Sequence, residues 1–213
     1  CIRDRCRVAA LNNDTRSVVW QGFDSAETIY AYTMSGEILA TVAAQYRGAA
    51  PPRVKPEPMR QAPDPVFVAD TTESFTDQVH ETVVRLVPRQ FTPLYTIIVE
   101  DVENIGSVVT CCASLSGLAA GKYLVSNRRM DVPVTMPSAM SVSGDIITGN
   151  MFCFGPTAAE MPHTLSIYVW LADGQKQVYT YDVSDIVNSN ADSLMLTIRA
   201  VSYTHLRAHE TGA

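Results

Sequence analysis

Apolar and polar residues alternate with a period of two along most of the chain, which is the spacing expected of β-strands. Residues 8–11 and 17–21 predict two short strands, joined by a turn rich in asparagine and aspartate. An aspartate and a serine at the start of segment 24–32 predict one or two capped helical turns. The apolar run 37–46 is extended or ambiguous in its pattern.

Six prolines between residues 51 and 65 predict an extended connector or a peripheral loop. We place a domain boundary just after them, near residues 70–74. Beyond this boundary, β-branched runs separated by glycine and serine are typical of a β-sandwich. The predicted strands cover residues 77–87, 94–102, 108–115, 123–126, 132–136, 145–154 and 194–199.

The clearest local pattern is a hairpin over residues 165–183, with Asp-Gly at its turn. A two-residue turn would pair Tyr168 with Tyr179, whereas a three-residue loop would pair Val169 with Tyr179. We favour the three-residue loop, because it gathers the apolar residues of both strands on one face.

The 213 residues suffice for one large β domain, or for one domain and part of a second. A formal net charge of −6 argues against a nucleic-acid partner, and no apolar run is long enough for a membrane helix. The five cysteines do not form a recognisable framework. Cys111 and Cys112 are adjacent and point to opposite faces of a strand; Cys153 could pair with one of them, or all three could be buried thiols.

No residue pattern in the sequence indicates catalysis. His80 and His163 are best explained as structural or surface histidines, since no nucleophile or phosphate-binding motif accompanies them. Three nearby carboxylates, Glu100, Asp101 and Glu103, fit a solvated loop better than a calcium site or a glycosidase pair. The sequence predicts a protein that is not an enzyme and needs no cofactor or metal.

Tyrosine and tryptophan side chains of the predicted hairpin form the candidate ligand contact. Tyr168 and Trp170, together with Tyr179 or Tyr181, could present rings to a carbohydrate. Packing across the strands or in the core explains the same residues at least as well.

The last residues, about 201–213, break the pattern of the preceding chain and resemble translated sequencing adapter. We therefore interpret this segment as an artefactual tail. His205, His209 and Glu210 have the spacing of metal ligands, but as part of such a tail they carry no function.

Several segments, in order, resemble a Bacteroidales lipoprotein family of the fimbrillin superfamily, related to FimB-like minor fimbrial anchor proteins and largely of unknown function. The segments are Leu11-Asn12-Asn13-Asp14-Thr15, Gly22-Phe23-Asp24-Ser25, Ala31-Tyr32-Thr33, Ser114-Leu115-Ser116-Gly117-Leu118-Ala119, Ile147-Thr148-Gly149, Phe154-Gly155, Leu165-Ser166-Ile167-Tyr168-Val169, Asp173-Gly174 and Tyr179-Thr180-Tyr181-Asp182-Val183. The family-motif residues expected to be structural are Asn12, Asn13, Asp14, Gly117, Gly155, Asp173, Gly174, Tyr181 and Asp182.

The resemblance implies an all-β, transthyretin-like (fimbrillin-like) fold with two β-sandwich domains in the complete protein. Residues 1–72 would be the C-terminal part of a truncated N-terminal sandwich with the proline-rich connector, 73–200 a complete sandwich, and 201–213 the tail. A signal peptide and a lipidated cysteine would precede this fragment, so contact with the membrane is expected only through the missing lipid anchor.

The function implied by the resemblance is structural: a fimbrial anchor or accessory subunit at the cell surface, outer membrane or fimbria, without catalytic residues. Its expected partners are other fimbrial subunits, joined by β-strand addition. The alternative is a surface module that binds a glycan or a host protein.

Overall fold

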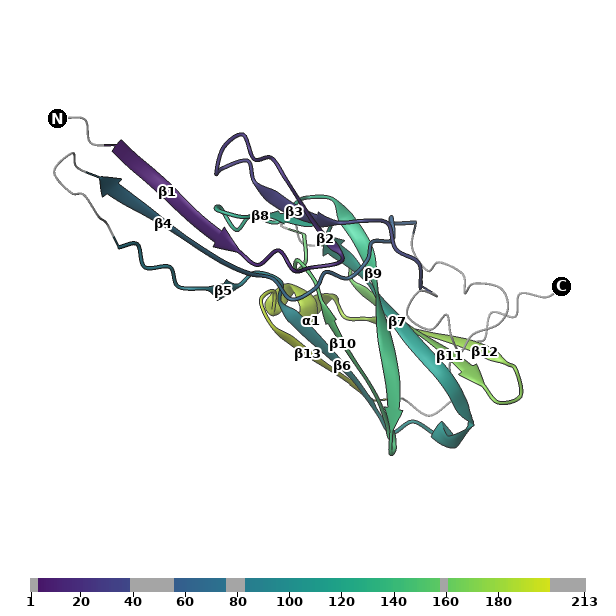
Figure 1. Cartoon of the computed structure of the whole chain (residues 1–213). Coiled ribbons are helices and arrows are strands. Elements are labelled where there is room, and N and C mark those ends of the chain that lie inside the picture. Colours follow the sequence, from purple (N-terminus) through teal and green to yellow (C-terminus); the bar gives the residue numbers. More distant parts are fainter. Residues whose placement is uncertain (1–3, 39–55, 76–82, 158–160, 200–213) are drawn as a thin grey trace.

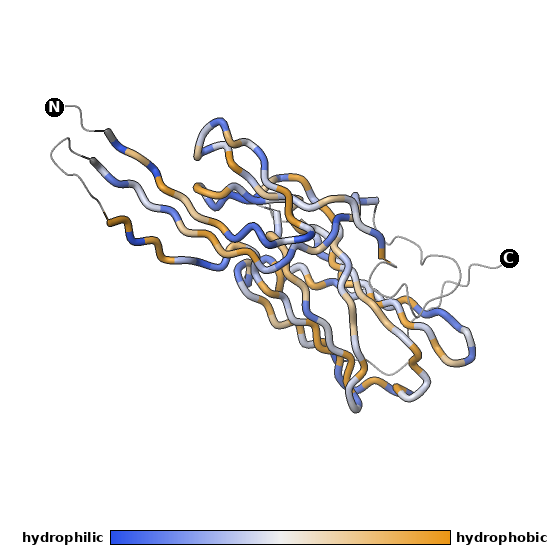
Figure 2. Tube along the Cα trace, viewed as in Figure 1, coloured by the Kyte–Doolittle hydropathy of each residue, from blue (hydrophilic) through white to orange (hydrophobic). Residues whose placement is uncertain are grey.

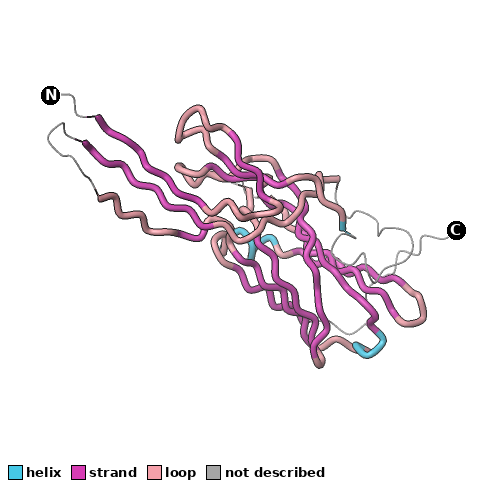
Figure 3. Tube along the Cα trace, in the orientation of Figure 1, coloured by secondary structure: helices cyan, strands magenta, loops and turns pink. Residues whose placement is uncertain are grey.

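The computed structural model describes residues 4–38, 56–75, 83–157 and 161–199, and strands dominate this part of the chain (Figure 3). The strands are β1 (Asp4–Leu11), β2 (Val18–Gln21), β3 (Tyr30–Thr33), β4 (Phe67–Phe75), β5 (Arg89–Gln90), β6 (Leu94–Glu100), β7 (Val108–Ala119), β8 (Gly121–Tyr123), β9 (Pro133–Ser143), β10 (Ile146–Phe152), β11 (Thr164–Leu171), β12 (Lys176–Asp182) and β13 (Leu194–Arg199). The named helices are η2 (Ile105–Ser107), a single 3-10 turn, and α1 (Ser184–Ser189). The predicted all-β fold class is confirmed.

A seven-stranded sheet, in the order β12-β11-β7-β9-β10-β6-β13, forms the main body. Its outermost strand β13 runs parallel to β6, whereas the other neighbouring strands are antiparallel. The sheet curls, so that β6, β10 and β13 lie opposite β7 and β11 (Figure 1). Apolar and polar residues alternate along these strands (Figure 2), and the buried apolar residues of both layers belong to one core cluster.

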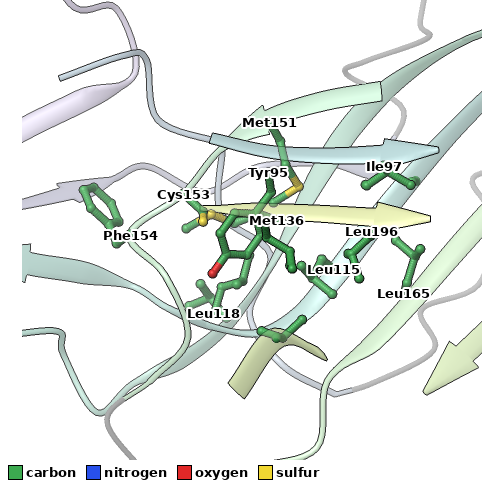
Figure 4. Close-up of a cluster of buried hydrophobic side chains, with 14 of the residues drawn as sticks. Tyr95, Ile97, Leu115, Leu118, Met136, Met151, Cys153, Phe154, Leu165 and Leu196 are labelled. Carbon is green, nitrogen blue, oxygen red and sulfur yellow. The ribbon is translucent and has the colours of Figure 1, made fainter. Parts of the chain in front are cut away.

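The core between the layers is formed by large side chains without solvent exposure, drawn in Figure 4. Tyr95 and Ile97 of β6 face Leu115 of β7 and Leu165 of β11, and Leu196 of β13 joins them. Each such side chain contributes about 2 kcal/mol through removal of its apolar surface from water.

Two three-stranded sheets complete the fold, with strand orders β1-β4-β5 and β2-β3-β8. Strands β1 and β4 extend away from the main body as a long antiparallel ribbon (Figure 1). The second sheet packs against the main body through aromatic rings: Trp20 lies 5.6 Å from Phe91, and Phe91 lies 6.3 Å from Phe154, measured between centroids. One cluster of buried side chains therefore spans the small sheet and the main sandwich.

The predicted division at residues 72/73 stays a prediction; these residues lie within β4, which pairs with β1 over residues 68–75. The proline-rich segment is extended in its described part, from residue 56 onward. It packs along β9, because Arg60 N donates to Thr135 O and Thr135 N donates to Pro58 O, both at 3.0 Å. Residues 39–55, which include the ambiguous run from 39 to 46, lie outside the described residues.

Three predicted elements are wrong. The strand expected over 123–126 ends at Tyr123, the last residue of β8, and residues 124–126 form a turn. The helical turns expected over 24–32 are replaced by a tight turn followed by β3, because Thr28 Oγ1 donates to Gly22 O at 2.6 Å and to Ser25 O at 2.9 Å. The strand expected over 77–87 pairs with no other strand in its described part, residues 83–87. No described sheet covers Val83, which is therefore 87% exposed. Residues 77–82 lie outside the described part.

The hairpin of β11 and β12 has the predicted loop length but not the predicted register. Ile167 pairs with Tyr179, and Val169 pairs with Gln177, two residues away from the expected register. The loop is 172–174, since Leu171 N donates to Gln175 O at 2.9 Å. Gly174 adopts φ 87°, which suits the last position of a three-residue loop. Because the shift is an even number, the face predicted for each side chain is unchanged.

Four cysteines lie in the described residues, and none of them forms a disulfide. Cys6 is exposed, whereas Cys111, Cys112 and Cys153 are buried. Burial raises the pKa of the Cys111 thiol to about 11 and that of Cys153 to about 12, so both remain protonated small core groups.

Candidate functional site: a cleft between the layers of the main sheet

A cleft of about 550 Å³ lies between the two layers of the main sheet. Its apolar wall is formed by alternating residues of four strands, namely Val99 (β6), Ile147 (β10), and Ile167 and Val169 (β11), with Tyr179 of β12 beside them. The cleft is partly open to solvent and is therefore a surface feature, not an interior void.

One end of the cleft is closed by a contact between two loops. Ala172 N, in the β11–β12 loop, donates to Ser107 O of η2 at 2.8 Å. Asp101 and Asn104, in the loop that precedes η2, adopt left-handed backbone conformations with φ of 56° and 54°. Aspartate and asparagine tolerate this region better than other residues with a β-carbon. The local sequence thus fixes the loop that borders the cleft.

Strand β13 is an outermost strand of the main sheet and is separated from the cleft lining by its neighbour β6, because Val99 of β6 lines the cleft and none of the described residues of β13 does. It pairs in parallel with β6, and its Ile198 lies opposite Val99, a residue of the cleft wall. Leu194, Leu196 and Ile198 point into the sandwich, while Met195 is 67% exposed. Within the described residues, β6 is the only strand that pairs with β13.

His163, the histidine in the described part of the chain, is fully buried and has a structural role. Its Nδ1 lies 2.9 Å from Ser116 O, and its Nε2 lies 3.1 Å from Asn188 Oδ1. Its backbone N donates to Ser184 Oγ at 2.9 Å. The ring therefore connects β7 to α1 and faces no solvent-filled site. His80 lies outside the described residues, as do His205, His209 and Glu210.

The acidic residues around 100–103 do not form a metal site together with other ligands. In the described ranges, no group of three or more histidine, cysteine, aspartate or glutamate side chains could hold a metal ion. Glu100 instead lies 3.7 Å from Arg199 in an exposed ion pair, and Glu103 borders the cleft.

Asn12, the first family-motif residue, joins β1 to the segment before β4. Its Oδ1 accepts from Phe67 N at 2.7 Å, and its Nδ2 donates to Asp14 Oδ1 at 2.9 Å and to Pro65 O at 3.2 Å. Asn13 and Asp14 are exposed. This motif fixes where β1 ends.

The motif glycines occupy places where a side chain would collide. A β-carbon on Gly117, at φ 78°, would lie 2.5 Å from His163 Nδ1, and one on Gly155, at φ 87°, would lie 2.7 Å from Arg129 Nε. Gly117 N donates to Glu57 Oε2 at 2.9 Å. Gly117 lies at the irregularity where the β7–β9 register shifts between Leu115 and Leu118.

The last motif residues shape the end of the sheet. Asp173 Oδ1 accepts from Gln175 N at 2.9 Å in the hairpin loop that ends with Gly174. Asp182 Oδ1 accepts from Ser184 N at 3.1 Å, which turns the chain from β12 into α1. Tyr181 packs partly buried against the core and lines the cleft.

The aromatic platform predicted on the hairpin does not form. Tyr168 and Trp170 are 2% and 6% exposed and belong to a buried cluster with Ile38, Met59 and Cys112. Tyr179 lies on the opposite face, in register with Ile167. Because β11 is buried on both faces, its alternating aromatic residues pack in the interior and cannot receive a glycan.

The sequence did not reveal the cleft, because its walls are the inward residues of strands far apart in the chain. A second surface that the sequence reasoning missed is the tyrosine-bearing face of the β2-β3-β8 sheet. The local signal for this face was the alternation Tyr30-Ala31-Tyr32, which lies at the end of the segment predicted to form helical turns.

The profile of the family described as "Domain of unknown function (DUF5119)" matches residues 2–138, which is more than half of the chain. The chain belongs to this family. None of the curated proteins compared with the sequence matches it. The narrower assignment to a FimB-like family stays a prediction.

Solved structures with a similar fold include a candidate adhesin from Bacteroides ovatus, 19% identical, with a TM-score of 0.59; the alignment covers 93% of this chain and 75% of that one. A second candidate adhesin from Bacteroides ovatus is 7% identical, with a TM-score of 0.57 and coverage of 96% and 70%. The fimbrial anchor protein Mfa2 from Porphyromonas gingivalis is 10% identical, with a TM-score of 0.47 and coverage of 93% and 69%. The two adhesin structures establish the β-sandwich fold. Among the described helices, none has the length and apolarity needed to cross a membrane.

Proposed function

We propose that this protein is a non-enzymatic subunit or anchor of a surface fimbria and that it joins a neighbouring subunit by β-strand addition. In this arrangement, a strand of the neighbour pairs with the outer edge of β13 and places its alternate apolar side chains in the space between the two layers. Attachment to the outer membrane through a lipidated cysteine, as the family resemblance implies, belongs to the same proposal.

The observation that carries the proposal is the cleft of about 550 Å³, whose wall includes Val99 of β6, the strand to which the outermost strand β13 pairs. Strand addition needs exposed backbone for hydrogen bonds and an apolar space for alternate side chains. Ile198, opposite Val99, brings both requirements to one place, because β13 supplies the edge and the cleft wall supplies the apolar surface. Each inserted apolar side chain would stabilise the complex by about 2 kcal/mol.

The position of the described histidine agrees with a structural role. His163 lies in the core between Ser116 O and Asn188 Oδ1, away from the cleft. The rim of the cleft carries Glu103, Asn104 and Asp173, but no imidazole or thiol lies among the described residues that line it.

A photo-reactive cross-linker at Thr197 tests the proposal. Thr197 is an exposed residue of β13, and its control is Thr148, a partly exposed residue of β10 that pairs with Ile98 of β6 on one side and with Ser141 of β9 on the other. With benzoylphenylalanine at Thr197 in cells that carry the fimbria, we expect one cross-linked peptide from a fimbrial subunit, identified by mass spectrometry. Equal cross-linking from both positions, or none from Thr197, would contradict strand addition at β13.

A second candidate function is binding of a glycan or a host protein. One observation favours it: three tyrosines gather on the solvent face of the β2-β3-β8 sheet, with an arginine against one ring.

A further inference from the structure

The β2-β3-β8 sheet has one buried face and one face that carries aromatic residues. Ala31 and Thr33 of β3 are fully buried, whereas Tyr30 and Tyr32 alternate with them and are only partly buried. Tyr30 pairs with Gln21 of β2 on one side and with Tyr123 of β8 on the other. The backbone register therefore places Gln21, Tyr30 and Tyr123 in one row across the outer face.

The rings on this face are close together. The centroid of Tyr30 lies 5.9 Å from that of Tyr32 and 5.8 Å from that of Tyr123, with interplanar angles of 39° and 54°. These distances are within the range of favourable aromatic contacts. The three rings thus form a continuous, partly exposed aromatic surface, called here the tyrosine face together with Gln21 and Arg128.

Gln21 connects the hydroxyl groups of two tyrosines. Tyr30 Oη donates to Gln21 Oε1 at 2.6 Å, and Gln21 Nε2 donates to Tyr32 Oη at 3.0 Å. This direction of bonding leaves the Tyr32 hydroxyl proton and the second amide proton of Gln21 as donors, and the Tyr30 oxygen as an acceptor. The network holds the rings in position, which lowers the entropic cost of binding a ligand.

Arg128 adds a positive charge to the tyrosine face. Its guanidinium carbon lies 4.3 Å from the centroid of the Tyr123 ring. Within the described part of the chain, no ion pair involves Arg128. The guanidinium therefore retains donors that match the geometry of a carboxylate.

Cross-strand packing alone would account for the aromatic contacts, but not for this combination of groups. An oriented hydroxyl–amide row and an arginine without a carboxylate partner border the same ring surface on a protein with a net charge of −6. Sugars present apolar C–H faces and many hydroxyl groups, and acidic sugars add a carboxylate.

We propose that the tyrosine face binds an acidic glycan, a saccharide with a carboxylate group. The rings of Tyr30, Tyr32 and Tyr123 would contact the apolar face of the sugar. The Tyr32 hydroxyl and the Gln21 amide would bind sugar hydroxyl groups, and Arg128 would bind the carboxylate. The inference rests on the second candidate function proposed above, and it specifies the residues and the ligand class.

The test is binding of the purified protein to an array that pairs sialylated and uronate-containing glycans with their neutral counterparts. We expect binding to acidic glycans, with affinity about tenfold lower in both Arg128→Gln and Tyr32→Phe. Tyr32→Phe keeps the ring and so preserves the sheet. Arg85→Gln removes an exposed arginine elsewhere and is the matched control, with unchanged binding expected.

Two results would overturn the inference in distinguishable ways. If acidic and neutral glycans bind equally and Arg128→Gln has no effect, the glycan-binding function is supported. The assignment of an acidic ligand and of Arg128 as its carboxylate contact is then wrong. If the wild-type protein binds no glycan, both the inference and the glycan-binding function fail, while the cross-link at Thr197 still decides strand addition independently.

Discussion

Nδ1 of His163 occupies the space that a β-carbon on Gly117 would need, since the two atoms would lie only 2.5 Å apart. Gly117 also has φ 78°, a conformation that other residues rarely adopt. Through this contact the irregular part of β7 packs directly on the ring that connects β7 to α1.

Gly117→Ala should therefore lower the free energy of unfolding by about 3 kcal/mol, from backbone strain plus overpacking. Gly144→Ala is the control, because Gly144 has φ 64° but a β-carbon there would meet no atom within 4 Å. The control substitution should lower the free energy of unfolding by only about 1 kcal/mol. Urea unfolding of both variants measures the difference, and equal losses would show that the His163 contact is unimportant.

Lys122 is a buried amine in the core, 3% exposed. Its Nζ donates to Phe91 O at 3.1 Å and lies 5.0 Å from the Phe91 ring centroid. Burial, followed by repulsion from Arg129, lowers its pKa to about 8. The folded state thus disfavours the charged form of Lys122. Lys122 destabilises the fold most below about pH 8, and this destabilisation decreases as the pH rises from about 8 towards the unfolded pKa of 10.5.

We expect Lys122→Met to be more stable than the wild type by about 2 kcal/mol at pH 7, with a smaller advantage at pH 10. Chemical unfolding at both pH values gives the two differences. Comparing variant with wild type cancels the opposite effect of the buried thiols, which destabilise the fold above about pH 9. Lys176→Met, at an exposed lysine, is the control. An advantage that does not change with pH would contradict this account of Lys122.

Asp64 fixes the proline-rich segment to the start of β2. Its Oδ2 accepts from Arg16 N, Ser17 N and Ser17 Oγ at 2.7 to 2.8 Å. Burial would raise the pKa of Asp64, but the hydrogen bonds from Ser17 and Arg16 outweigh it and lower the pKa below 3.8. The stabilisation is therefore present above pH 3.8 and is lost as the pH falls through the lower folded pKa.

Asp64→Asn should lower the free energy of unfolding by about 2 kcal/mol at pH 7. The loss should shrink as the pH falls below 4, because the wild-type carboxyl then becomes neutral as well. Thermal unfolding of wild type and variant between pH 3 and pH 7 measures this trend. If the loss of unfolding free energy were the same at every pH, the effect of Asp64→Asn would come from the altered packing of the side chain and not from the charge of the carboxylate.

Trp170→Ala separates a core residue from a ligand contact. Because Trp170 packs with Ile38, Met59 and Tyr168, its removal should destabilise the protein by about 3 to 5 kcal/mol. Trp170→Phe should recover part of this loss, as judged by urea unfolding. Glycan binding by the Phe variant should equal that of the wild type. A loss of glycan binding without a loss of stability would contradict the core role and support Trp170 as a ligand contact.

The sequence predicted β6, β10 and β13 well, because each is a local run of alternating or β-branched residues. It could not predict that β13 pairs in parallel with β6, about a hundred residues earlier in the chain, because such pairing depends on the whole fold. The same limit applies to the sites. The sequence left Trp170 open between a ligand contact and a core residue, because alternation alone does not show that β11 is covered on both sides. Tyr30 and Tyr123 meet only because β3 pairs with β8.

The central claim, strand addition at β13, is tested most directly by hydrogen exchange of the β13 amides, residues 194–199. Exchange is compared between the purified protein and the same protein assembled in the fimbria, with β11, whose residues 165–170 pair with both β7 and β12, as the internal reference. We expect the outward-pointing amides of β13 to exchange at least about tenfold more slowly after assembly, while β11 stays unchanged. Equal exchange of β13 in the two states would contradict the proposal.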